Sequence, residues 1–255
     1  MMTALGLESY TAASIIVLVV TAFVGGLARG FFGFGAALIF MPIASAFMGA
    51  QIASPMLLIV DTIATVPLIP GALRYADRRE VALMAVGSLV GVPLGAWALT
   101  AMDPLAVRWM IVALIVPMLA LLMSGWRYPG RITAAVTTCV GGISGFFNGV
   151  AQVGGPPVVL YWLRDVGKVI TMRANIILLF AISGVITAIS YLAGGLFSYA
   201  IVGLAVLIAP AYGIGLWLGS HMFGLASEAT FRRICYALIA LAALVSLPVF
   251  DGVLR

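Results

Sequence analysis

Charged residues are scarce in this 255-residue chain: they make up 8% of the sequence, whereas 64% of the residues are hydrophobic. A soluble domain carries about 25% charged residues, because its surface must be compatible with water. The mean hydropathy of +1.23 points the same way, so most of the exposed surface must face lipid. The sequence predicts an all-α integral membrane protein and leaves too little polar sequence for a separate soluble domain.

Cysteine and histidine are also rare, with two cysteines and one histidine in the chain. Cys139 and Cys235 fall in apolar segments, so the sequence has neither a disulfide framework nor a metal-ligand spacing, and we expect no cofactor. The formal net charge of +5 would suggest nucleic acid binding in a soluble protein. In a membrane protein, basic residues instead gather in cytoplasmic loops. No basic stretch precedes Arg29, so we expect the first apolar segment to be retained rather than cleaved as a signal peptide.

Long uncharged runs mark the expected membrane segments. A helix rises about 1.5 Å per residue, so about 20 residues cross a hydrocarbon core of about 30 Å. The runs cover residues 11–28, 30–49, 54–73, 81–101, 109–125, 132–163, 174–194, 198–219 and 234–250.

Two of these regions do not fit simple spans. The first joins residues 11–28 to 30–49 through a cluster of Gly25, Gly26, Arg29, Gly30, Gly33 and Gly35. The second, residues 132–163, is too long for one span and too short for two spans with a loop. It is interrupted at residues 145–149, where Gly145 and Gly149 flank Phe-Phe-Asn, and again at Gly154-Gly155-Pro156-Pro157. Glycine loosens a helix and proline removes a backbone donor, so both regions predict broken or re-entrant helical hairpins.

The two hairpins resemble each other in sequence, which indicates an internal duplication. Gly30-Phe31-Phe32-Gly33 recurs as Gly145-Phe146-Phe147-Asn148, and residues 95–115 align with residues 219–239 so that Arg108 falls on Arg232. We therefore expect a first transmembrane repeat over residues 1–124, a cytoplasmic linker over residues 125–131 and a second repeat over residues 132–255. Internal symmetry of this kind is common among transporters.

Basic loops change sides between the two halves, which predicts that the repeats are inverted. The basic loop near Arg74 corresponds to the uncharged residues 194–198, and the uncharged residues 49–53 correspond to a basic loop near Arg173. The positive-inside rule then places ten basic residues in the cytoplasm: Arg74, Arg78, Arg79, Arg127, Arg131, Arg164, Lys168, Arg173, Arg232 and Arg233.

This arrangement leaves Arg108, Arg255 and both termini outside, and each repeat becomes a hairpin followed by three transmembrane helices. The alternative is a parallel arrangement with four plain spans in each half. It would scatter the positive charges over both sides of the membrane.

A helix that is broken inside a membrane exposes backbone N–H groups with a partial positive charge, and such ends bind anions. Inverted hairpins would bring two such ends together near the midplane, where we predict the substrate site. Asn148 and Gln152 could donate to an oxyanion without adding charge. In the alternative interpretation, the glycines only allow close helix packing. The candidate residues are Arg29, Gly30, Phe31, Phe32, Gly33, Gly35, Asn148, Gly149, Gln152, Gly154 and Gly155.

Asp61 lies near the middle of an apolar segment, where a carboxylate is costly unless it is paired, solvated or protonated. It is the candidate coupling residue, because protonation would let it carry a proton. Alternatively it is a structural acid paired with Thr62, Asn175 or Arg29. Arg29 also has two interpretations: it holds the anion, or it extends its head group to the cytoplasmic interface.

With these paired glycine hairpins the chain resembles the sulfite exporter TauE/SafE family of bacterial membrane proteins. The resemblance rests on residues 24–35 and 141–157 and extends over the duplicated halves. It implies a secondary transporter, not an enzyme, that exports sulfite or an organosulfonate across the bacterial cytoplasmic (inner) membrane, with proton coupling left open. The expected partners are a small anionic substrate and the lipid bilayer, and no nucleic acid. A homodimer is compatible with the sequence.

Two other functions stay open at this point. The first is a passive anion channel, which would use the same hairpins without coupling. The second is an intramembrane serine protease, because residues 142–145 have the local form G-x-S-G and His221 is an available base. A serine nucleophile needs its base within hydrogen-bond reach, and we expect His221 at a cytoplasmic helix end.

Overall fold

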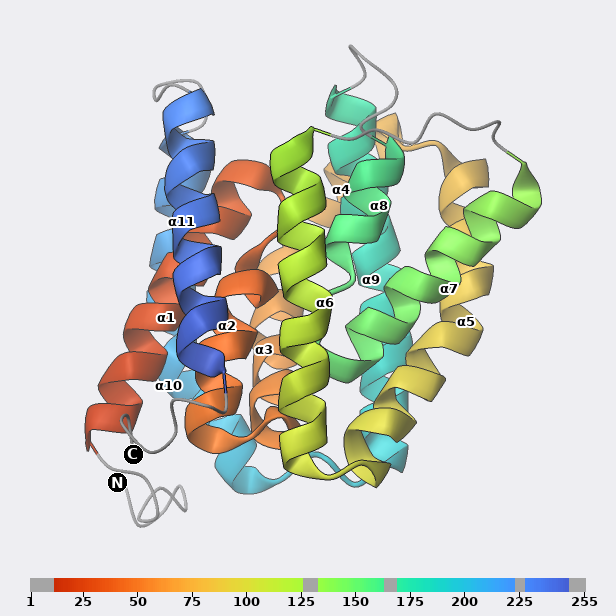
Figure 1. The fold of residues 1–255 in the computed structure, drawn as a ribbon. Helices are drawn as coiled ribbons and strands as arrows, with labels where there is room; N and C mark the ends of the chain where they lie inside the picture. Colours follow the sequence, from red (N-terminus) through yellow and green to blue (C-terminus); the bar gives the residue numbers. More distant parts are fainter. Residues whose placement is uncertain (1–11, 126–132, 163–168, 223–227, 248–255) are drawn as a thin grey trace.

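The computed structural model describes residues 12–125, 133–162, 169–222 and 228–247. Within these ranges the chain forms helices and no strands (Figure 1). A short 3-10 helix, η2 (Val66–Leu68), joins two of the α-helices. The α-helices are α1 (Ala12–Phe32), α2 (Ala36–Met48), α3 (Ala50–Thr65), α4 (Ile69–Tyr75), α5 (Arg78–Ala101), α6 (Pro104–Ser124), α7 (Ala134–Ala151), α8 (Gly155–Trp162), α9 (Val169–Ala193), α10 (Tyr199–Met222) and α11 (Glu228–Ser246).

Seven helical segments in the described part of the chain are long and apolar enough to cross a membrane. They correspond to α1, α5, α6, α7, α9 and α10, together with one continuous segment from Ala50 to Tyr75 that contains α3, η2 and α4. Pro67 lies in η2 and Pro70 in the first turn of α4. Because proline has no backbone N–H, the α-helical hydrogen bonds are interrupted here, and one 3-10 turn joins α3 to α4 within the same span. The all-helical membrane protein expected from the sequence is therefore confirmed.

Hairpins occur in both regions that do not fit simple spans. α1 is followed after residues 33–35 by α2, and α7 is followed after residues 152–154 by α8. α2 has 13 residues, and α8 has 8 in the described part of the chain; at about 1.5 Å per residue neither described segment is long enough to cross a core of about 30 Å. Both are buried along most of their length, so they are internal half-helices enclosed by longer ones.

Each helix break falls at the later part of its predicted glycine cluster: the first at residues 33–35, and the second at residues 152–154, which reaches Gly154. α1 continues through Gly25, Gly26 and Gly30, and α7 continues through the expected interruption at residues 145–149. The prediction was wrong at these points because glycine by itself does not end a helix. A helix tolerates it where a neighbouring backbone fills the space of the missing side chain.

That close approach defines the two tightest helix pairs, α5 with α7 and α1 with α10. A Cβ added to Gly91 of α5 would overlap the carbonyl oxygen of Gly142 in α7. On the other pair, a Cβ on Gly30 of α1 would overlap the carbonyl oxygen of Leu216 in α10. The remaining glycines in these two contacts are Gly26, Gly87, Gly95, Gly141, Gly145, Gly149, Gly215 and Gly219.

Each of these pairs joins the two halves of the sequence. The first helix of the first half, α1, packs on α10 of the second half, and the first helix of the second half, α7, packs on α5 of the first. In Figure 1, α1 runs upward and α7 downward, while α5 runs downward and α10 upward. Helices at matching positions in the two halves therefore run in opposite directions.

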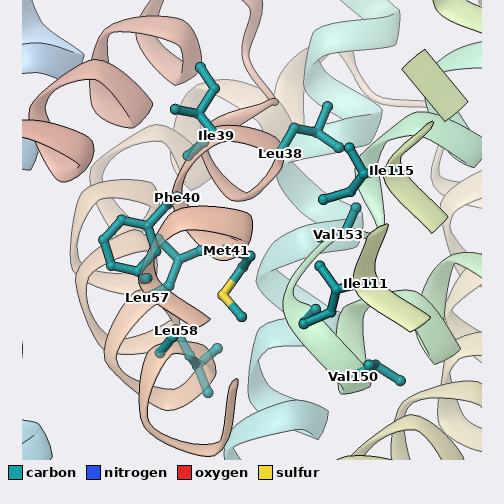
Figure 2. Packing of buried hydrophobic residues seen from close by; sticks show 14 of the residues in the cluster. Leu38, Ile39, Phe40, Met41, Leu57, Leu58, Ile111, Ile115, Val150 and Val153 are labelled. Carbon is teal, nitrogen blue, oxygen red and sulfur yellow. The ribbon is translucent and has the colours of Figure 1, made fainter. Parts of the chain in front are cut away.

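The core lies around α2. Figure 2 shows Leu38 and Met41 of α2 among side chains from three other parts of the chain: Leu57 of α3, Ile111 of α6 and Val153 in the segment that follows α7. All of these side chains are buried. The half-helix is therefore held on several sides by apolar contacts, which fixes the position of its N-terminal end.

Basic residues gather at one end of the bundle. The end of α4 and the beginnings of α5, α9 and α11 all lie at the upper end of the bundle in Figure 1, and these segments contain Arg74, Arg78, Arg173 and Arg233. Arg79 follows Arg78 in α5, and Arg232 precedes Arg233 in α11. The other residues assigned to the cytoplasm, Arg127, Arg131, Arg164 and Lys168, lie outside the described residues, as do Arg255 and most of the expected linker.

We expect Gly91→Ala to destabilise the protein by on the order of 1–3 kcal/mol, because the new methyl group forces the backbones of α5 and α7 apart. Thermal unfolding of the detergent-solubilised protein, followed by size-exclusion chromatography, measures the change. Gly213→Ala is the matched control, because Gly213 is an exposed residue of α10 with open space at its Cβ position. Equal thermal stability of the two variants would contradict the close-packing interpretation.

Candidate functional site

The two helix breaks face one cavity of about 120 Å³, which is partly open because the lining residues Thr62, Val66 and Val185 are exposed. Gly35, with φ of 103°, precedes α2, and Ala36 and Ala37 in the first turn of α2 line the cavity. From the other hairpin, Gly155 and Pro156 at the start of α8 line the same cavity. The first N–H groups of a helix have no partner inside it and carry a partial positive charge. Two helix N-termini thus converge on a space that can hold a small anion.

The two N-termini do not offer equal numbers of donors. α8 begins Gly155-Pro156-Pro157, and proline has no backbone N–H. α2 has no proline in its first turn. On the side of α8, the cavity is lined in addition by the amide side chains of Asn148 and Gln152. These amides are placed to provide donors that the proline-containing turn lacks.

Asn148 is held in position by a buried hydrogen bond. Its Nδ2 donates to Oγ1 of Thr187 in α9 at 3.0 Å, and the Thr187 hydroxyl donates in turn to the carbonyl oxygen of Ser183 at 2.7 Å. Asn148 is buried, with an exposed fraction of 6%. An amide fixed in this way is oriented before any ligand arrives, which lowers the entropy cost of binding.

Gln152 occupies a strained backbone conformation. It ends α7 with φ of 58° and is the one residue other than glycine with positive φ in the described part of the chain. This left-handed region costs an L-amino acid about 1–2 kcal/mol. Its Nε2 donates to the carbonyl oxygen of Asn148 at 3.3 Å. Strain of this kind is concentrated at functional positions, and here it turns an amide side chain toward the cavity.

Arg29 and Asp61 form an ion pair on the cavity wall. Nη2 of Arg29 lies 2.9 Å from Oδ2 of Asp61 and donates to Oγ1 of Thr65 at 3.1 Å, while Nη1 donates to the carbonyl oxygen of Gly33 at 3.0 Å. The guanidinium also lies 5.4 Å from the ring centroid of Phe180. Arg29 is 8% exposed, so it does not extend to the membrane interface.

The second oxygen of Asp61 binds a third helix. The hydroxyl of Tyr212 in α10 donates to Oδ1 of Asp61. Of the partners considered from the sequence, Arg29 is observed, whereas Asn175 accepts a hydrogen bond from the backbone N–H of Asp77 at 2.8 Å. Asp61 therefore connects α1, α3 and α10, and it remains partly accessible, with 24% of its side chain exposed.

The structure separates the sequence-predicted site residues into two sets. Arg29, Gly35, Asp61, Asn148, Gln152 and Gly155 line the cavity. The others lie beside it: Gly30 and Gly149 in the close helix contacts, Gly33 in the first break, Phe31 and Phe32 in the last turn of α1, and Gly154 under the hydroxyl of Ser144.

Sequence reasoning missed Thr65, Phe180, Thr187 and Tyr212. Thr65 could have been found, because it follows Asp61 by four residues and so shares its helix face. The other three lie on α9 and α10. Phe180 lines the cavity, whereas Thr187 and Tyr212 contact the lining residues Asn148 and Asp61, and these contacts depend on how the two halves pack.

The groups that suggested a serine protease have other partners. Oγ of Ser144 donates to the carbonyl oxygen of Gly154 at 2.6 Å. Nδ1 of His221 lies 2.9 Å from the carbonyl oxygen of Trp217, on the exposed last turn of α10. A nucleophile must have its base within hydrogen-bond reach, and these contacts give the protease alternative no support.

Comparison with known proteins identifies relatives over almost the whole chain. The family model for "Sulfite exporter TauE/SafE" matches residues 18–246. A protein of Cupriavidus necator named "Probable sulfite/organosulfonate exporter TauE" is 26% identical over 236 residues, which cover 86% of this chain and 89% of the relative. No solved structure matches the chain.

We expect Gln152→Gly to raise the stability of the protein by on the order of 1 kcal/mol, because glycine adopts positive φ without the penalty that glutamine carries. Gln152→Ala, which keeps the penalty, should not give this gain. Thermal unfolding of both variants beside the wild type measures the difference. A glycine variant less stable than the alanine variant would show that the backbone at this position is not strained.

Proposed function

Because this chain belongs to the sulfite exporter TauE/SafE family, a family of multi-pass bacterial membrane transporters, we propose that it exports sulfite or an organosulfonate. The substrate binds in the cavity between the N-termini of α2 and α8. The observation that carries this proposal is the convergence of two interrupted helices on one cavity. An anion that leaves water must regain hydrogen bonds from the protein, and helix N-termini supply them without a bulky cation.

The lining of the cavity suits a sulfur oxyanion in both charge and shape. Asn148, Gln152 and the first turn of α2 offer donors on one side. Leu57, Leu58 and Val185 give the cavity an apolar wall as well. A sulfite oxygen or a sulfonate group would lie against the donors, and the carbon chain of an organosulfonate would lie against the apolar wall.

We infer that the two halves are inverted repeats and that the substrate site lies on their pseudo-twofold axis. Support comes from the opposite directions of matching helices and from the exchange of α1 and α7 between the halves. The basic end of the bundle then faces the cytoplasm. In transporters of this type, alternating access arises when one repeat rocks against the other around a fixed central site.

We further infer that Asp61 couples transport to protons. It is partly accessible, it lies on the cavity wall, and its two oxygens hold Arg29 of α1 and Tyr212 of α10. Protonation would remove the negative charge that holds the Arg29 guanidinium, so the contact between α1 and α3 would weaken. A proton could thereby change both the electrostatics of the site and the packing of the helices around it.

We expect Asn148→Ala and Gln152→Ala each to weaken substrate binding by about tenfold or more, because a hydrogen bond to a charged group contributes about 1.5–3 kcal/mol. Isothermal titration of the purified protein with sulfite and with methanesulfonate measures the affinity. Gln51→Ala is the control, since Gln51 donates to the carbonyl oxygen of Leu99 at the other end of α3. If both cavity variants bind as tightly as the wild type, the proposed site is wrong.

We expect a pH gradient across proteoliposomes to drive methanesulfonate uphill through the wild-type protein. Methanesulfonate is chosen because it keeps one negative charge at every working pH, so the gradient cannot act on the substrate itself. Asp61→Asn should keep downhill flux and lose the pH-driven component. Purely downhill flux through the wild type would identify a passive channel.

A further inference from the structure

The fixed charges on the cavity wall cancel. Among the described residues that line the cavity, Arg29 and Asp61 carry charge, and their contact at 2.9 Å makes the pair neutral as a unit. The guanidinium is also engaged by Thr65 and by the carbonyl oxygen of Gly33. The side chains therefore offer an incoming anion no net charge.

The remaining positive potential comes from the backbone. The N-terminus of a helix acts as roughly half an elementary charge, and two N-termini, those of α2 and α8, line the cavity. Together they correspond to at most about one positive charge, because the two prolines that begin α8 remove backbone N–H groups from its first turn. A ligand with one negative charge is balanced by this potential, whereas the second charge of a dianion is left without compensation beside the carboxylate of Asp61.

The apolar wall limits the ligand further. Phe180, Val153 and Leu57 line the cavity together with the donors. A group with charge at one end and carbon at the other can satisfy both surfaces. An inorganic dianion such as sulfate would have to leave charged oxygen atoms against apolar side chains, which is unfavourable.

We propose that Asp61 determines the charge selectivity of the site: by neutralising Arg29 it restricts binding to singly charged anions, alkanesulfonates and hydrogen sulfite, and excludes dianions. The inference rests on the proposed function, because it presupposes that the sulfur anion binds in this cavity. Asp61 acts through Arg29 and through the repulsion it exerts on a second negative charge. Tyr212 holds the carboxylate in place from α10.

The test compares methanesulfonate with sulfate, two tetrahedral anions that differ by a methyl group in place of a charged oxygen atom. Affinities are measured by titration of the full-length protein in lipid nanodiscs at constant ionic strength. The wild type should bind methanesulfonate at least tenfold more tightly than sulfate. Asp61→Asn frees the charge of Arg29 and should shift the ratio of the two affinities toward sulfate by at least tenfold.

Two further variants distinguish an effect of charge on the affinity ratio from a structural disturbance caused by the substitution itself. The double variant Arg29→Gln, Asp61→Asn removes both charges, so it should return the affinity ratio to within about threefold of the wild-type ratio. Asp103→Asn makes the same chemical change at an exposed helix cap, where Asp103 accepts from the backbone N–H of Leu105 at 2.8 Å, and asparagine caps a helix equally well. It should leave the ratio unchanged.

The outcomes distinguish this inference from the proposed function. If the wild type binds sulfate as tightly as methanesulfonate, or if Asp61→Asn folds and leaves the ratio unchanged, the selectivity role of Asp61 is overturned while the exporter proposal stands. If neither sulfite nor methanesulfonate binds to the wild type or crosses the membrane through it, the proposed function fails. The wild-type comparison needs no variant, so it decides the question even if Asp61→Asn does not fold.

Discussion

A backbone that stops being helical inside a bilayer must satisfy its polar groups within the protein, and this constraint governs the whole architecture. Both breaks obey it. The carbonyl oxygen of Gly33 accepts from Arg29, and that of Gly154 accepts from Ser144. The backbone N–H groups of Gln152 and Val153 donate to carbonyl oxygens at the end of α7. The groups left facing the cavity are those at the N-termini of α2 and α8, and the proposed anion site follows from them.

The glycine contacts are what allow the half-helices to be enclosed. α1 lies against α10 and α7 lies against α5 with their backbones almost touching. Lipid tails are as apolar as leucine, so association in the membrane depends on close packing and on hydrogen bonds between helices. Both are present here, since the hydroxyl of Ser88 in α5 donates to the carbonyl oxygen of Gly141 in α7 at 3.1 Å.

The sequence alone was sufficient to predict the class of protein, the two hairpins and six of the residues that line the cavity. These features depend on local composition, because apolar runs and the interruptions between them can be read directly from neighbouring residues. The sequence was misleading where glycine could indicate either a helix break or a close contact between two helices. Residues 145–149 looked like a break and are helical, because the determining factor is the neighbouring backbone of α5, which no local pattern reveals. The partners of Asp61 illustrate the same limit. Tyr212 lies 151 residues away, and only the packing of α10 on α1 brings it near.

The pairing of α1 with α10 has a consequence for biosynthesis. A ribosome exposes the N-terminal helices first, but Gly26 and Gly30 of α1 reach their partners only after Tyr212 and Leu216 have been made. Until then the glycine face of α1 stays in contact with lipid or with the insertion machinery. The native arrangement of the first hairpin, and of the ion pair between Arg29 and Asp61 beside it, is therefore completed late in translation. A truncated chain that ends before α10 would be inserted in the membrane with its first half unable to reach the native fold.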